Sequence, residues 1–407
     1  MKKKLLSVFM TAMLAVTLLT GCGTKSNPSD TTEPTADSDS PAAATTAPVS
    51  SDASGTIKIG TISPNTGSLA AYGEAVVNAM ILAVDEINAA GGILGQQVEL
   101  DSLDDKGDST EGANAFNKLA DDSDICAVIG SVTSGVTTGL APLADDAKIV
   151  LLSPTATADT VTETDDYVFR ACYKDSYQGR MAAKFASDKG IKKVAVLYAS
   201  GDAYSSGLHE AFIAAAEEFG LEIVSEESSS SVDDTEYSAQ LTNIANSGAE
   251  YLFAPYYYSS VGPYIVPQAR AAGFSGIIMG ADGFDGTIGT MVDDKSLYNN
   301  CFFTNHYSPD DTSEVVQNFV KNYTAKFSAE SLNALAALAY DSVYMLKQSI
   351  EKAGSVDRTA IRDAMSGMSF SGVTGSFTLD EAGTPEKSVA IIEFKDGAAI
   401  WNSTLSN

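Results

Sequence analysis

The greater part of the chain consists of short apolar runs that alternate with longer segments of helical periodicity. Ile57–Ile62 is an apolar run of strand length. Over residues 73–89, apolar residues then recur at helical spacing until Gly91 and Gly92 end the pattern. The same reasoning predicts a helix near residues 110–121 and strands at Val98–Leu103, Ile125–Val132 and Ile149–Leu152. This alternation indicates a parallel sheet covered by helices on both faces.

A second round of the same plan begins at the apolar run Val194–Tyr198. Its predicted helices lie near residues 205–219, 236–247 and 263–272, and its other predicted strands are Glu222–Ser225, Tyr251–Pro255 and Ile277–Gly280. The sequence therefore predicts an α/β fold of two doubly wound parallel-sheet lobes. Open α/β sheets bind ligands at the carboxyl ends of their strands, so two such edges facing each other form a cleft.

The first residues of the chain have the pattern of an export signal. Lys2, Lys3 and Lys4 precede a stretch that is uncharged and mostly apolar up to Leu19-Thr20-Gly21-Cys22. The stretch is short for a membrane span and resembles the lipobox of bacterial lipoproteins, whose cysteine is lipidated after cleavage. We expect residues 1–21 to be a lipoprotein signal peptide and Cys22 to carry the lipid. The alternative is an ordinary signal peptide with an incidental cysteine.

Residues 22–55 are expected to form a disordered tether behind the lipid. Ser, Thr, Ala, Pro and Asp dominate the segment, and large apolar side chains are scarce. Such a composition buries too little surface to offset the entropy of ordering. The predicted location is therefore the outer face of the bacterial cytoplasmic membrane. That is the cell surface, or the periplasm if the cell is Gram-negative.

The charge balance excludes several classes of partner. The chain has 25 Lys+Arg against 53 Asp+Glu, a formal net charge of −28, so phosphate backbones and anionic headgroups would repel it. We expect no nucleic-acid partner. The chain has only two histidines, His209 and His306, and we expect both to be solvated or packing residues rather than general bases.

No motif in the chain indicates a cofactor, a metal or a catalytic group. The glycine-rich nucleotide motifs and the G-x-S-x-G nucleophile elbow are missing from the sequence. Asp104, Asp105 and Asp108 are dense, but their spacing does not match a calcium loop, so we expect a solvated loop edge. We therefore expect no enzyme activity and no cofactor.

Three cysteines remain beyond Cys22, namely Cys126, Cys172 and Cys301. Three cannot all pair within one chain, so at least one is free. Cys126 lies in an apolar strand-like run, where a small buried side chain is expected. Stability should therefore come from burial of the core and not from disulfides.

Four loops that follow predicted strands offer polar groups. They are Ser131–Gly135, Ser153–Thr157, Tyr256–Tyr258 and Ala281–Gly283. Small hydroxyl residues at a strand-to-helix turn suit an anion, the carboxylate of Asp282 suits a cation, and tyrosines supply apolar walls. Together these groups describe a site for a free α-amino acid with an apolar side chain. Alternation along the tyrosine run sends one or two of the three into packing, and we select Tyr257 as the ligand contact.

Several of these segments together resemble one family. They are the helix opening Tyr72-Gly73, the run Asn88–Gly95, the serine-containing loop after Gly130, Ser153–Thr157 and Gly280–Gly283. The chain resembles the leucine/isoleucine/valine-type solute-binding proteins of ABC importers over residues 56–400. The resemblance implies a type I periplasmic-binding-protein fold with three hinge crossings, acting as a monomer that delivers its ligand to an ABC permease in the membrane.

The resemblance also implies lobe boundaries and roles for individual residues. Lobe 1 would comprise residues 56–173 plus 307–374, and lobe 2 residues 174–306 plus 375–407. The ligand carboxylate would be held by Ser134 and Thr157 with the backbone of Thr155 and Ala156, the ammonium by Asp282, and the side chain by Tyr72, Tyr204 and Tyr257. One departure is Thr133, which stands where some family members have a disulfide cysteine.

Three rival interpretations stay open from the sequence. The same fold could bind a small amide, urea or an aromatic acid, although Asp282 argues against a ligand without a cationic group. The chain could instead be a surface sensor or an adhesion lipoprotein that binds a macromolecule. An enzyme is the third alternative, and the sequence offers no nucleophile–base pair to support it.

Overall fold

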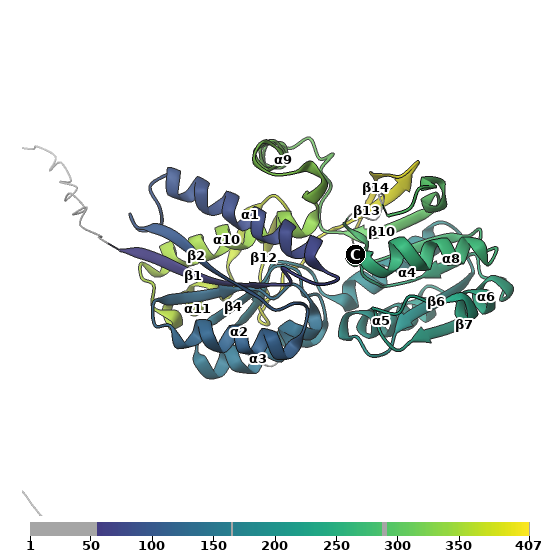
Figure 1. Cartoon of the computed structure of the whole chain (residues 1–407), viewed down its shortest axis with the longest axis horizontal. Helices are drawn as coiled ribbons and strands as arrows, with labels where there is room; N and C mark the ends of the chain where they lie inside the picture. Colours follow the sequence, from purple (N-terminus) through teal and green to yellow (C-terminus); the bar gives the residue numbers. More distant parts are fainter. Residues whose placement is uncertain (1–54, 164–165, 287–290, 407) are drawn as a thin grey trace, which may run out of the picture. The chain divides into compact units, whose positions relative to one another are not determined.

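The computed structural model describes residues 55–163, 166–286 and 291–406 (Figure 1). The predicted signal peptide 1–21, the predicted lipid site Cys22 and all but the last residue of the predicted tether lie outside these ranges. None of the described helices is long and apolar enough to cross a membrane.

The first lobe is built on a five-stranded sheet with the strand order β2-β1-β3-β4-β5, and every pair in it is parallel. The strands are β1 (Thr56–Ser63), β2 (Gln97–Asp104), β3 (Ile125–Ile129), β4 (Val150–Ser153) and β5 (Val168–Arg170). Its helices are α1 (Ala70–Ala89), α2 (Ser109–Asp121), α3 (Ser134–Ala147), α10 (Ala334–Ala353) and α11 (Arg358–Met365). In Figure 1, α1 and α10 lie on one side of the strands and α2 and α3 on the other.

Alternation along the strands explains why both faces of this sheet are covered. In β4, Val150 and Leu152 belong to the core that contains α1 and α10, whereas Leu151 belongs to the core under α2 and α3. Successive side chains of a strand point to opposite faces, so a strand that is apolar throughout requires helices on both sides.

The second lobe is built on a seven-stranded sheet with the order β14-β13-β10-β9-β8-β6-β7. The strands are β6 (Lys193–Ala199), β7 (Glu222–Ser229), β8 (Tyr251–Phe253), β9 (Ile277–Gly280), β10 (Cys301–Asn305), β13 (Val389–Lys395) and β14 (Ala398–Leu405). Its helices are α4 (Asp175–Asp188), α5 (Ala203–Glu218), α6 (Ser238–Asn246), α7 (Tyr258–Ser260) and α8 (Val266–Ala271). In β6, Val194 and Val196 join the core with α4 and α5, and Ala195 and Leu197 join the core with α6 and α8.

The two sheets repeat one strand order, which confirms the predicted pair of doubly wound lobes. Within the second sheet, β7-β6-β8-β9-β10 has the sequence order 2-1-3-4-5, as β2-β1-β3-β4-β5 has in the first. The sheet then gains a feature that the sequence did not predict, because β13 and β14 extend it as antiparallel strands. β14 lies at the edge and is largely exposed, so its pattern of apolar residues is weak.

One predicted helix is broken in the structure. The segment expected as a helix over 263–272 begins inside a π-helical turn over Val261–Ile265, which follows α7, and continues as α8. Pro263 lies within that turn and Pro267 at the start of α8. Since proline has no backbone N–H, it cannot continue the ladder of hydrogen bonds, and a π turn absorbs the defect.

The chain passes between the two sheets three times. It crosses between β5 and α4, between β10 and α9 (Glu314–Lys326), and in the stretch that precedes β13. A small hairpin, β11 (Ser369–Gly372) and β12 (Gly375–Thr378), precedes the third crossing. The number of crossings agrees with the prediction, while the lobe boundaries given above stay predictions.

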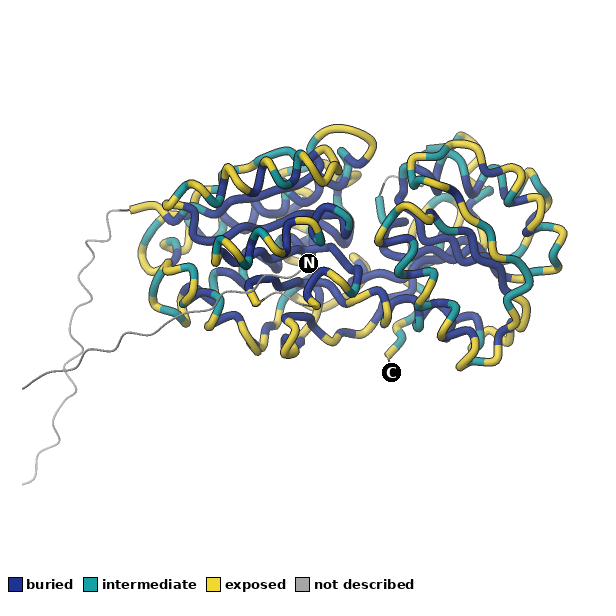
Figure 2. Tube along the Cα trace, turned by 90° about the horizontal axis from the view of Figure 1, so that it is seen from below, coloured by how far each residue is buried: buried dark blue, intermediate teal, exposed yellow. Residues whose placement is uncertain are grey.

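The strands of both lobes are mostly buried, and the exposed residues are concentrated on helices and loops (Figure 2). Cys126, Cys172 and Cys301 are all buried and all free. Among the described residues, stability therefore rests on core burial, as the sequence predicted.

Candidate functional site

The site is formed at the carboxyl ends of equivalent strands in the two sheets. In each lobe, the residues follow the strands that come first, third and fourth along the chain, namely β1, β3 and β4 or β6, β8 and β9. The loops diverge at this edge of the sheet and leave a crevice between them. The first lobe supplies Tyr72, Ser134 and Thr155, and the second supplies Tyr204, Tyr257 and Asp282. These six predicted residues line one cavity, which Val132, Thr133, Gly283 and Leu335 complete.

The cavity has a volume of about 20 Å³. That volume holds about one water molecule. A free amino acid does not fit, so its binding requires the walls of the cavity to move apart.

The other two predicted residues, Ala156 and Thr157, do not line this cavity. The Ala156 N–H donates to Ser153 Oγ at 3.0 Å. The Thr157 hydroxyl is buried and has no well-aligned hydrogen bond among the described residues. It lies near Asp175, whose pKa is raised well above its ordinary value by burial and by the negative charge of Asp282, an effect that the hydroxyl only partly opposes. Their predicted contact with a ligand stays a prediction.

Ser134 joins two of the loops at the cavity. It is the first residue of α3, and its Oγ accepts a hydrogen bond from the Ala158 N–H at 3.1 Å. Thr155 adds a second link, since its hydroxyl donates to the Val132 carbonyl at 2.7 Å. The two hydroxyl-rich loops that the sequence singled out are therefore bound to each other.

Arg170 holds the Ser153–Thr157 loop from behind, and sequence reasoning missed it. Its side chain is fully buried, and Nη1 donates to the carbonyl oxygens of Ala156, Thr157 and Ala158 at 3.2, 2.9 and 2.9 Å. In a trans peptide the carbonyl and the following N–H point in opposite directions. The N–H groups of Thr157 and Ala158 therefore point away from the guanidinium, and the second of them meets Ser134. The only signal in the sequence is a charged residue inside an apolar run.

Asp282 is buried and held by three neutral donors of its own lobe, which leave part of Oδ2 open. Its Oδ1 accepts from Gln178 Nε2 at 2.9 Å and from the Tyr204 hydroxyl at 3.0 Å, and its Oδ2 lies 3.1 Å from His306 Nε2. Gln178 Oε1 in turn accepts from the Asp282 N–H at 3.2 Å. These contacts fix the position of the carboxylate before any ligand is bound.

The two histidines have different environments. His306 is buried, stacks on Tyr173 with the ring centroids 3.9 Å apart, and contacts Asp282. The expectation that His306 is a packing residue is confirmed, and the alternative of a solvated side chain is wrong. Its contact with Asp282 was not predicted from the sequence. His209 packs on the Tyr198 ring at 3.8 Å and lies 3.0 Å from Glu226, as a packing residue.

The three consecutive tyrosines divide as alternation predicts. Tyr257 lines the cavity and stacks on Tyr204 with centroids 5.1 Å apart. The Tyr256 hydroxyl pairs with Ser229 at 2.8 Å within the second lobe. The Tyr258 hydroxyl reaches the first lobe, where it donates to the Ser68 carbonyl at 3.0 Å.

The predicted solvated edge at Asp104, Asp105 and Asp108 is wrong for Asp105. That side chain is buried, accepts hydrogen bonds from Ser131 and the Gly107 N–H, and has a pKa raised by burial. The loop turns inward after β2, which brings Asp105 under the end of β3. Asp108 caps the N-terminus of α2. Within the described ranges, no group of His, Cys, Asp or Glu could hold a metal ion.

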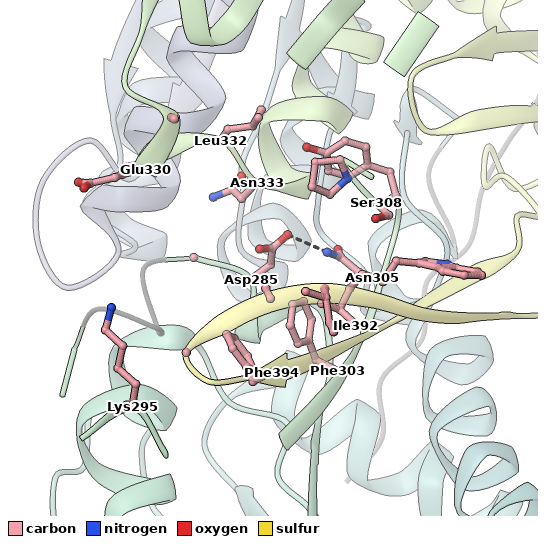
Figure 3. Close-up of a pocket in the computed structure, with 18 residues that line it drawn as sticks. Asp285, Lys295, Phe303, Asn305, Ser308, Glu330, Leu332, Asn333, Ile392 and Phe394 are labelled. Carbon is pink, nitrogen blue, oxygen red and sulfur yellow. Dashed lines mark hydrogen bonds between the residues drawn. The ribbon is translucent and has the colours of Figure 1, made fainter. Parts of the chain in front are cut away.

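A larger cavity of about 300 Å³ lies between β10, the β13–β14 hairpin and the segment before α10 (Figure 3). Asp285 lines it and accepts hydrogen bonds from Asn305 Nδ2 at 2.7 Å and the Ala334 N–H at 2.8 Å. Burial raises the pKa of Asp285 to about 6. None of the eight predicted ligand residues lines this cavity.

Comparisons with known proteins agree with this geometry. The chain is 34% identical over 339 residues to the Leu/Ile/Val-binding protein BraC3 of Rhizobium johnstonii, covering 80% of this chain and 88% of that protein. It is 31% identical over 360 residues to the Leu/Ile/Val-binding protein homolog 3 of Brucella melitensis, covering 84% and 93%.

Solved structures give the same picture. The substrate-binding protein LivJ of Streptococcus pneumoniae, solved in complex with isoleucine, matches with a TM-score of 0.79 and 34% identity, covering 86% of this chain and 99% of that one. The leucine-binding protein LivK of Thermotoga maritima matches with a TM-score of 0.79 and 32% identity, covering 86% and 98%. The family model described as "Periplasmic binding protein" matches residues 56–399. The chain belongs to the periplasmic binding protein family.

Proposed function

We propose that the protein is the solute-binding component of an ABC importer and captures a free apolar L-amino acid, branched-chain or aromatic, between its two lobes. One observation carries the proposal. Ser134 and Thr155 of the first lobe and Asp282 of the second line the same cavity, with three tyrosines beside them. Hydroxyl groups and loop N–H groups suit a carboxylate, and Asp282 suits an ammonium group.

The charged groups of the ligand supply most of the proposed affinity. Burial of an aliphatic side chain contributes about 1.5–3 kcal/mol, whereas micromolar affinity requires about 8 kcal/mol. A difference of one methylene against an apolar wall discriminates by about 1–3 kcal/mol. We therefore expect a strict requirement for both α-groups and broader acceptance among apolar side chains. The three tyrosines also suit an aromatic acid, but such a ligand offers no cation to Asp282.

The proposed setting follows from the family and from the first residues of the chain. Members of the periplasmic binding protein family act outside the cytoplasm as solute-binding proteins. We propose that Cys22 is lipidated after removal of residues 1–21 and that residues 22–55 tether the two lobes to the outer face of the membrane. A monomer would then deliver its ligand to the membrane permease.

Isothermal titration calorimetry and thermal unfolding with matched ligands test the proposed function. L-Leucine, L-isoleucine, L-valine and L-phenylalanine should bind and raise the unfolding midpoint. 4-Methylpentanoate lacks the ammonium group and 3-methylbutylamine lacks the carboxylate, so neither should bind at comparable concentration. Binding of urea, a small amide or benzoate, with no response to any amino acid, would contradict the proposal. Recovery of a chemically altered ligand would instead indicate an enzyme.

A further inference from the structure

The contact between His306 and Asp282 carries an inference about how the proposed amino-acid site is controlled. His306 directly follows β10, and Asp282 lies just beyond the end of the neighbouring strand β9. Both residues therefore lie at the carboxyl ends of two neighbouring parallel strands of one sheet. The imidazole is completely buried and the carboxylate nearly so, with relative side-chain exposures of 0% and 5%.

The hydrogen-bond pattern around the ring defines its protonation. Nε2 lies 3.1 Å from Asp282 Oδ2, and a carboxylate accepts but does not donate, so the proton is on Nε2. Nδ1 is buried and has no hydrogen-bond partner among the described residues. An imidazolium would carry a second proton on Nδ1, which would be a buried donor without an acceptor. The geometry therefore favours the neutral ring with the proton on Nε2.

His306 lies in the second crossing between the lobes, and groups from the other two crossings lie around its ring. Tyr173 in the first crossing stacks on the imidazole, and Lys387 in the third is near enough to disfavour its positive form. Asp282 is the group that favours that form, and burial outweighs it, so the pKa of His306 is lowered. Lysine or arginine in this place would neutralise Asp282, whereas a neutral imidazole holds the carboxylate and leaves its charge available.

We propose that His306 is a positioning residue that presents Asp282 to the ligand ammonium as a free negative charge, and that its protonation switches the site off. This inference rests on the proposed function. At neutral pH the ring donates one hydrogen bond and carries no charge. In acid the imidazolium pairs with Asp282 and repels the ligand ammonium, so bound ligand is released. Gln178 and Tyr204, which hold the other carboxylate oxygen, remain neutral throughout.

The decisive variant is His306→Gln, because its Nε2 amide can donate like the imidazole but cannot gain a charge. L-Leucine affinity of the unchanged protein should fall at least about tenfold between about pH 7.5 and pH 4.5 as the imidazole is protonated. His306→Gln should bind within about threefold of the unchanged protein at pH 7.5 and should lose most of that dependence. His209→Gln, which changes the other histidine, should keep it. Asp285→Asn is a second control, because Asp285 is another buried group and its pKa, about 6, also lies in this range. An unaltered acid dependence in His306→Gln, or its loss in Asp285→Asn alone, would overturn the proposal.

Nitrogen NMR of the histidine rings provides a readout that needs no ligand. With two histidines in the chain, His209→Gln assigns the His306 signals. The expected spectrum at neutral pH is that of a neutral ring protonated on Nε2. A ring protonated on Nδ1, or an imidazolium at pH 7.5, would refute the role of His306 whatever the ligand is. If the NMR result holds and no amino acid binds, the proposed function fails and the assigned protonation state stands.

Discussion

Arg170 Nη1 lies 2.9 Å from the carbonyl oxygen of Thr157, which places a buried cation directly behind the loop proposed to bind the ligand carboxylate. The same atom also bonds the carbonyls on either side of Thr157. Because three acceptors converge on one nitrogen and Nη2 reaches Thr162, the flat guanidinium fixes the path of the loop as well as its charge.

Arg170→Lys should therefore weaken ligand binding more than it weakens the fold. An ammonium group cannot reproduce the fork of donors, so the loop N–H groups lose their direction. We expect L-leucine affinity to fall by about tenfold or more in calorimetry, which corresponds to about 1.4 kcal/mol.

A matched control is Arg358→Lys. Arg358 likewise donates to backbone carbonyls of the first lobe, among them those of Ile125 and Asp122 at 3.0 and 2.9 Å, but it does not line the cavity. Its loss should lower the unfolding midpoint and leave the affinity unchanged. Equal losses of affinity in both variants would assign the effect of Arg170 to general destabilisation.

Asp282→Asn should remove most of the affinity for amino acids while the lobe stays folded. The asparagine keeps the shape of the side chain and one carbonyl acceptor for Gln178 and Tyr204, but it has no charge for the ammonium group. Loss of a buried charge partner costs about 2–5 kcal/mol, so the dissociation constant should rise at least about thirtyfold. Glu210→Gln removes an exposed acid of the same lobe and should change nothing. An unchanged affinity in Asp282→Asn would remove this residue from the site.

The residues that follow strands could be predicted from the sequence, and those that support them could not. Asp282 and Tyr257 stand at strand ends, where the rule for open α/β sheets places ligand groups. Gln178 and Asp282 are 104 positions apart, and nothing in a single sequence pairs them. Asp105 looked solvated because its neighbours are acidic, yet the turn after β2 buries it.

The same contrast holds for the fold. Apolar runs predicted most of the parallel strands of both lobes, and fully buried runs such as β3 and β4 require two covered faces. The parallel strands β5 and β10 were not predicted from the sequence. The edge strand β14 escaped prediction because it has no buried residue and so carries no clear apolar pattern. The buried apolar run of β13 was also not predicted, and nothing in a single sequence gives its antiparallel pairing with β10. The sequence also did not reveal that Pro263 and Pro267 would interrupt the helix after β8.

Tyr258→Phe should weaken closure of the lobes. Its hydroxyl donates to the Ser68 carbonyl at 3.0 Å and accepts from the Ala71 N–H at 3.3 Å, and both partners belong to the first lobe. Loss of these partly buried bonds should cost about 1 kcal/mol and reduce ligand affinity about fivefold. Small-angle scattering of the ligand-free protein should show a larger radius of gyration.

Tyr256→Phe is the control for the neighbouring ring. Tyr256 bonds to Ser229 inside the second lobe, so its hydroxyl contributes to stability but not to closure. The two variants should lose similar stability, and only Tyr258→Phe should lose affinity. If Tyr256→Phe weakened binding as much, the contact of Tyr258 with the first lobe would have no part in closure.

Lys387 should make the protein more stable as the pH rises above about 8. Its side chain is buried, Nζ donates to Thr374 Oγ1 at 2.7 Å, and that hydroxyl donates to Asp341 at 2.6 Å. Burial lowers the pKa of Lys387 from 10.5 to about 8 despite the attraction of Asp341. Below pH 8 the folded and unfolded chains both hold the proton, and the cost of the buried charge is constant. Between about pH 8 and pH 10.5 the unfolded chain holds more protons, so the free energy of unfolding rises.

The lowered pKa of Lys387 sets the size of this effect. One pKa unit corresponds to about 1.4 kcal/mol, so the free energy of unfolding should rise by roughly 3 kcal/mol over that pH range. The free energy of unfolding in urea should be measured for the unchanged protein and for Lys387→Met. The difference between the two should shift in favour of the unchanged protein as the pH is raised, because the contributions of the other titrating groups are the same in both and cancel. Lys395→Met, at an exposed position of β13, controls for the loss of a lysine as such. A difference that stays flat up to pH 10.5 would mean that Lys387 keeps its proton in the fold, with Asp341 as the stronger influence on it.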